Sequence, residues 1–144
     1  MAFRIGDATI LSMLSPLFSA VDSGYLRFYN GTMPATPDDA MVGETLLMEI
    51  ALPNPAFQTP ANQGTYYRIH IQPGLSGTGL AAAGVGTQCN FVRFYASNGT
   101  SCIWQDNDVD QVTGRIYMSD ELIAEGQVHN IANWWYDFDK EVAN

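Results

Sequence analysis

The sequence predicts an all-β fold, a single-domain β-sandwich of jelly-roll type with a short N-terminal α-helix. The first observation is a motif that occurs twice, RFYNGT at 27–32 and RFYASNGT at 93–100. A third segment, YYRIHI at 66–71, is weakly similar to it. The two longer copies end in Asn-Gly, which tolerates the positive φ angles of tight hairpin turns. The second is a composition of 12% aromatic residues, 13 Gly and 7 Pro, which favours short strands and many turns. The third is the lack of alternating strand and helix patterns, which argues against a parallel α/β sheet.

The N-terminal helix is predicted over residues 7–22 of one domain that spans residues 1–144. Asp7 suits the N-cap position, Pro16 should kink the helix, and Gly24 is a natural stop. Apolar residues recur at helical spacing at Ile10, Leu14, Leu17 and Val21. We expect the helix to lie across one end or face of a sheet, or alternatively to form an arm that docks on a neighbouring subunit.

Strands are predicted wherever aromatic and β-branched residues alternate with polar ones. The predicted strands are Tyr25–Tyr29, Leu46–Leu52, Tyr66–Gln72, Asn90–Tyr95, Ser101–Asp106, Gly114–Met118 and Gly126–Asp137. For the Gly/Ala-rich segment 74–86 a mobile or partly extended loop is favoured, and the alternative is a flat strand under close backbone approach. Residues 139–144 form an acidic tail that we expect to fray.

The two cysteines flank the hairpin turn at Asn98-Gly99. A turn centred there places Cys102 opposite Tyr95 and Cys89 opposite Asp108. Because a disulfide requires close Cβ atoms, this register does not pair the thiols. Both cysteines are therefore expected to be small buried apolar residues.

The charge pattern excludes several classes of partner. The net charge is −9, and the positive side is five Arg and one Lys scattered along the chain, so neither nucleic acid nor an anionic membrane is an expected partner. No apolar run approaches the roughly 18 residues that span a bilayer. Asp7 and Pro16 interrupt the apolar start, which is therefore interpreted as mature protein made in the cytoplasm. Charged residues are only 15% of the chain, which favours a protein interface.

One acidic motif is a candidate metal site. Asp106, Asp108 and Asp110 alternate and would share one face of an extended strand, where Ca²⁺ is conceivable. The EF-hand loop is excluded because Gln111 and Tyr117 stand where it requires Gly and Glu. The favoured interpretation is an exposed acidic edge that discourages strand-to-strand aggregation, so no metal ligand is predicted.

No catalytic constellation is found, and the chain is not expected to be an enzyme or to hold a cofactor. His70 and His129 are the only histidines and are interpreted as structural, and no nucleophile elbow, HExxH or CxxC spacing occurs. The run Trp134-Trp135-Tyr136 is similar to a sugar-stacking platform, in which Trp134 and Tyr136 would share one face. Core or interface anchoring is the preferred role of these rings.

Short motifs along most of the chain resemble a type of small virion structural protein of tailed bacteriophages. They are Arg27-Phe28-Tyr29-Asn30-Gly31, Leu46-Leu47-Met48-Glu49, Pro55-Ala56-Phe57, FVRFYASNGTSCIW and GQVHNIANWWYDF. The chain departs from the pattern at Asn90, where relatives carry Trp, and in the acidic tail after Phe138. The resemblance implies a β-sandwich that assembles on a virion, most plausibly as a capsid cement or decoration protein.

Such a protein would bind the outside of the head in the virion and stabilise contacts between major capsid protein subunits. Self-association as a dimer or trimer would match the symmetry of its site. Aromatic and Arg anchors should carry the binding: Arg27, Tyr29, Tyr67, Arg68, Trp134, Trp135 and Tyr136. The alternatives are a tail, neck or baseplate structural protein, and a carbohydrate-binding module.

Overall fold

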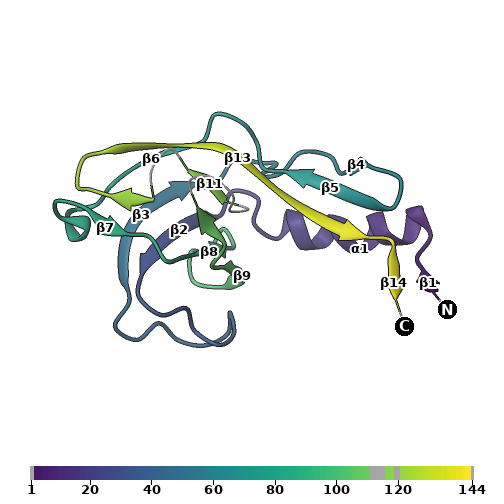
Figure 1. Cartoon of the computed structure of the whole chain (residues 1–144), viewed down its shortest axis with the longest axis horizontal. Coiled ribbons are helices and arrows are strands. Elements are labelled where there is room, and N and C mark those ends of the chain that lie inside the picture. Colours follow the sequence, from purple (N-terminus) through teal and green to yellow (C-terminus); the bar gives the residue numbers. More distant parts are fainter. Residues whose placement is uncertain (1, 111–115, 119–120, 144) are drawn as a thin grey trace.

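The computed structural model describes residues 2–110, 116–118 and 121–143. Figure 1 shows an elongated molecule with two unlike halves. One half holds β2, β3, β8 and β9, and the other holds α1, β4 and β5 (Figure 1). The long strand β13 (Val128–Asp139) runs through both halves, and the two chain ends lie together at the α1 end.

The first half is built on a four-stranded antiparallel sheet. Its order is β3 (Thr45–Ala51), β2 (Tyr25–Asn30), β8 (Phe91–Tyr95) and β9 (Cys102–Asp106). The repeated sequence motif forms the two central strands, so that Arg27 lies directly opposite Arg93. Along β2, Leu26 and Phe28 are buried while Tyr25 and Arg27 are half-exposed, as the alternation predicts.

The second sheet is organised around β13. On one side of β13 lie β5 (Tyr66–His70) and then β4 (Ala61–Asn62). On its other side lie β11 (Ile116–Met118) and then β10 (Val109–Asp110), and β10 pairs with β11 in parallel. Strand β6 (Ser76–Thr78) pairs with the start of β13. Two small pairs complete the fold, β1 (Ala2–Arg4) with β14 (Glu141–Ala143), and β7 (Thr87–Gln88) with β12 (Leu122–Ile123).

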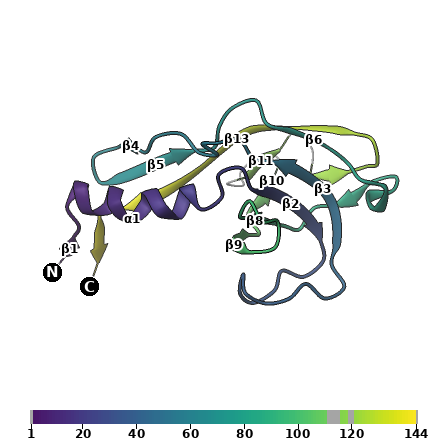
Figure 2. The ribbon, with the colours of Figure 1, turned by 180° about the vertical axis from the view of Figure 1, so that it is seen from behind.

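The core lies between the two sheets and under α1. The rings of Phe94 and Trp134 meet edge-to-face at 5.2 Å between centroids, which joins the four-stranded sheet to β13. Helix α1 (Asp7–Ser19) buries Ile10, Leu14 and Phe18 against the ribbon of β5 and β13. Figure 2 shows the helix running along this ribbon from behind. The chain is therefore mainly β with one helix across a sheet face, as predicted.

The helix differs in detail from the prediction. It ends at Ser19 rather than at Asp22, and it continues through Pro16. Gly6, which has an extended backbone, is the N-cap residue in place of Asp7, and the Asp7 carboxylate lies 2.9 Å from Lys140 Nζ. Gly24 follows a turn, and a Cβ there would lie 2.0 Å from the Tyr95 carbonyl oxygen, so close backbone approach requires glycine.

Two segments expected to be irregular contain short regular elements. The acidic tail 139–144 was expected to fray, but β14 pairs with β1, and the Ile5 amide donates to the Lys140 carbonyl at 2.8 Å. Within 74–86 the structure forms β6 and a 3₁₀ turn at Ala81–Ala83 and is otherwise turn or coil, which agrees with a loop that is partly extended. A Cβ on Gly77 would lie 2.8 Å from Ile50 Cγ1, which explains the small residue.

The Asn-Gly hairpin is confirmed at its turn, where Tyr95 pairs with Cys102. A bulge between Phe94 and Tyr95 then shifts the register by one residue, so the predicted pairing of Cys89 with Asp108 is wrong. The Cys89 amide donates instead to the Glu121 carbonyl at 2.9 Å. Both cysteines are free thiols, and Cys89 is buried as expected, whereas Cys102 is only partly buried. The predicted strand start at Gly114 lies outside the described residues.

Candidate binding surfaces

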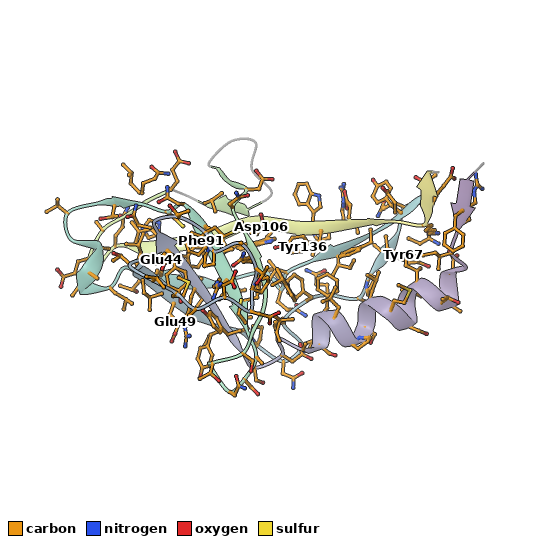
Figure 3. All side chains as sticks on the ribbon, turned by 90° about the horizontal axis from the view of Figure 1, so that it is seen from below. Glu44, Glu49, Tyr67, Phe91, Asp106 and Tyr136 are labelled. Atoms are coloured by element: carbon orange, nitrogen blue, oxygen red, sulfur yellow. The ribbon has the colours of Figure 1, made fainter. Side chains whose placement is uncertain are left out.

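One face of the β5–β13 ribbon points away from α1, and we call its outward side chains Tyr66, Arg68, His70, Trp135 and Asp137 the ribbon face. The alternation of the two paired strands puts these residues on one side. The opposite side chains, Tyr67 and Tyr136 among them, lie between β13 and α1 in Figure 3. The helix thus covers one face of the ribbon and leaves the other as a candidate contact surface.

Arg68 is the centre of the ribbon face. Its Nε donates to Asp137 Oδ1 at 2.8 Å and its Nη2 donates to Oδ2 at 2.9 Å, a bidentate pair across the two strands. The guanidinium carbon also lies 4.8 Å from the Trp135 ring centroid and 5.5 Å from that of Tyr66. The hydrogen bonds to Asp137 raise the pKa of Arg68, which keeps the charge fixed. The side chain is held in one place yet remains 30% exposed.

Arg27 forms a second cluster of the same design on the four-stranded sheet. Its Nε donates to Glu49 Oε2 at 2.6 Å and its Nη1 donates to the Gly99 carbonyl at 2.8 Å. Its guanidinium carbon lies 4.5 Å from the Tyr95 ring centroid. The side chain is 21% exposed, so Arg27 is a candidate anchor of lower accessibility.

Its neighbour in the register, Arg93, is instead covered by the chain itself. Its Nη2 donates to the carbonyls of Thr36 and Asp39 at 3.2 and 3.1 Å, and its Nε donates to Gln105 Oε1 at 3.0 Å. The Pro- and Asp-rich loop after β2 therefore lies over the outer face of β8. Arg27 and Arg93 lie opposite each other, and the repulsion between their charges is offset because each guanidinium donates to its own set of acceptors.

The structure divides the seven predicted anchors between surface and core. Arg27, Arg68 and Trp135 reach the surface. Tyr29, Tyr67 and Trp134 are buried within the chain, at 7%, 4% and 1% exposure. Tyr29 is buried because it stacks on Phe91 at 5.3 Å on the covered outer face of the four-stranded sheet.

Tyr136 belongs to a buried polar network rather than to an open surface. Its hydroxyl donates to Asp106 Oδ2 at 3.1 Å and accepts from Trp104 Nε1 at 3.2 Å, and Figure 3 shows Asp106 and Tyr136 together. Burial, and then the Asp106 carboxylate, raise the pKa of Tyr136 well above its ordinary value. Trp134 and Tyr136 share a face as expected, and that face is the core, which agrees with the preferred anchoring role rather than with the sugar-stacking alternative.

The acidic run does not form the exposed edge that the sequence favoured. Asp106 is only 7% exposed, and its Oδ1 accepts the Asp108 amide at 2.9 Å. The side chain of Asp110 lies outside the described part of the chain. Within the residues that are described, no three His, Cys, Asp or Glu side chains gather as metal ligands would.

The histidines occupy different environments. His70 lies on the ribbon face, 5.8 Å from the Trp135 ring. His129 is fully buried beside β6, and neither ring nitrogen has a hydrogen-bond partner among the described residues. Along β13 the buried positions change from odd numbers at His129 and Ile131 to an even number at Trp134, so strict alternation could not have identified all of them.

No known protein family, curated protein or solved structure matches the chain. In the described residues, no helix has both the length and the apolar character needed to cross a bilayer.

Proposed function

We propose that the chain is a tailed-bacteriophage capsid cement protein that binds the outside of the head and stabilises contacts between major capsid protein subunits. The motif resemblance described above suggests this role. The observation that carries it in the structure is the ribbon face, where Arg68 is locked between Asp137 and Trp135 yet still exposed. Arg and Trp on a rigid platform are the residue types that anchor protein interfaces.

The physical need for such a protein follows from packaged DNA, whose pressure pulls capsid subunits apart. A small protein that bridges two subunits adds buried area at each joint, and many copies multiply a modest gain. An elongated body suits that role, because its two ends can contact different subunits (Figure 1). Self-association as a dimer or trimer would follow from the symmetry of the lattice site.

The finer fold assignment, a β-sandwich of jelly-roll type, is part of this proposal. Its support is the face-to-face contact of the two sheets through Phe94 and Trp134, and through Gly77 against Ile50. The parallel β10–β11 pair and the extended β5–β13 ribbon are additions to that plan.

The molar ratio of this chain to the major capsid protein in purified particles tests the function. Quantitative mass spectrometry should give a ratio near one or a simple fraction such as a half or a third. A ratio of a few per cent would place the protein in the tail, neck or baseplate instead. Absence from particles would remove the virion role altogether.

A further inference from the structure

A groove runs along the side of α1 that faces the segment before β4. Its volume is about 930 Å³. The apolar residues Leu11, Pro55, Pro60 and Pro73 line it and are at least partly exposed, so it offers an apolar surface beside the helix. Leu14, Phe57 and Ile69 also line it but are buried. This groove lies on the α1 side of β5, whereas the ribbon face lies on the opposite side.

One wall of the groove is a sheet edge. Phe57 and Ile71 form an antiparallel bridge, in which the Gln58 amide donates to the His70 carbonyl and the Gln72 amide donates to the Ala56 carbonyl. In such a bridge the N–H and C=O of Phe57 point away from the paired strand. The Phe57 and Thr59 amides have no partner among the residues that the structure describes, and both residues line the groove.

The charge of the groove is one-sided. Among the described residues, Asp22 is the only charged one that lines it. Asp22 Oδ1 accepts the Ala56 amide at 2.8 Å, which fixes the carboxylate at one end of the groove. The chain as a whole carries a net charge of −9. A ligand here is therefore favoured by a positive charge near Asp22.

We propose that this groove binds an extended segment of another polypeptide, which adds a β-strand to the Phe57–Thr59 edge and places a Lys or Arg beside Asp22. The Phe57 and Thr59 amides favour an extended peptide, because the carbonyls of a strand can accept from both. The Phe57 carbonyl already accepts from Gln72 Nε2 at 3.4 Å. The apolar surface takes every second side chain, and α1 forms the far wall. The proposal does not depend on the ribbon face or on the virion role.

A random peptide library displayed on beads and selected on the purified chain tests the proposal. The recovered peptides should be enriched in apolar residues at alternate positions and in one Lys or Arg. The tightest of them is then synthesised with a fluorophore, and its Kd is measured by polarisation. N-methylation of its alternate backbone amides should weaken binding by about tenfold or more, because each blocked amide removes a strand hydrogen bond.

Matched variants of the protein localise the site. Thr59→Pro removes an amide that has no partner within the described chain and should weaken peptide binding by about tenfold, whereas Thr59→Ala keeps that amide and should bind as wild type. Ser15→Trp fills the groove and should therefore weaken peptide binding. Ser12→Trp, on the same helix but outside the groove, is its control and should bind as wild type. Asp22→Asn should remove the preference for Lys or Arg. Circular dichroism verifies that each variant is folded.

Three outcomes would overturn the proposal. The first is a library that yields no binder. The second is a binder that tolerates both N-methylation and Thr59→Pro. The third is dimerisation of the isolated chain that Thr59→Pro abolishes, which would make a second copy of this chain the occupant of the groove.

Discussion

Arg68 on β5 and Asp137 on β13 lie directly opposite each other, and two guanidinium N–H groups donate to the two carboxylate oxygens at 2.8 and 2.9 Å. Trp135 holds the same guanidinium from a second direction, at 4.8 Å from its ring centroid. The arginine is therefore fixed before any partner arrives, which reduces the conformational entropy lost on binding. We regard this pair as the organising contact of the ribbon face.

The first prediction concerns the buried network around Tyr136. Tyr136→Phe removes the hydroxyl that donates to Asp106 and accepts from Trp104. We expect the free energy of unfolding to fall by about 1–3 kcal/mol, because polar groups that lose a buried partner keep their desolvation penalty. Urea denaturation measures the change. Tyr25→Phe, at a half-exposed tyrosine, is the control, and an equal loss in both variants would contradict the assignment.

The second prediction concerns the buried imidazole. His129 is fully buried and lacks hydrogen-bond partners within the described residues, so its two nitrogens are desolvated without compensation. His129→Leu should raise the free energy of unfolding by about 1 kcal/mol. His70→Leu on the ribbon face should bring no such gain. Destabilisation by His129→Leu would show that the imidazole has a partner in solution.

The third prediction concerns alkaline pH. Burial raises the pKa of the Cys89 thiol from its ordinary 9.0 to about 12. The resulting stability is fully present below pH 9 and falls as the pH rises toward 12, because the unfolded chain ionises first. Urea midpoints between pH 8 and 11 should therefore decline more steeply for the wild type than for Cys89→Ala. Parallel declines would contradict the burial of this thiol.

The fourth prediction concerns a backbone contact in the Gly/Ala-rich segment. A Cβ on Gly79 would lie 1.9 Å from the carbonyl oxygen of Ala124, and a backbone atom yields less readily than a side chain. Gly79→Ala should lower the free energy of unfolding by about 3 kcal/mol. Ser76→Ala, at an exposed position of β6, should leave stability near wild type. A stable Gly79→Ala protein would mean that the segment is not packed against residue 124.

The sequence predicted the strands better than their partners. Alternation located β2, β3, β5, β8, β9 and β13, because side-chain period is a local property. It did not predict that the repeated motif would pair with itself, which places Arg27 opposite Arg93. Nor did it reveal the bulge beside Tyr95, since that extra residue is accommodated by tertiary packing rather than by local pattern.

The candidate site was predicted in part. Arg68 and Trp135 were named, but Trp134 and Tyr67 were named with them, because alternation assigns two faces without saying which one is covered. Here α1 decides the matter by packing Phe18 against Phe138, 5.7 Å between ring centroids. The groove was not predicted, since it is formed by segments distant in sequence. The pairing of the tail was missed because its partner, β1, lies at the other end of the chain.

The most direct test of the ribbon face in the proposed cement role uses phage particles that lack this protein, to which purified protein is added back. We expect Trp135→Ala and Arg68→Ala each to weaken binding to these particles by about thirtyfold, as loss of an interface hot spot does. Val85→Ala, at an exposed apolar residue in the other half of the molecule, is the control and should bind as wild type. Full binding by both ribbon-face variants would contradict the account.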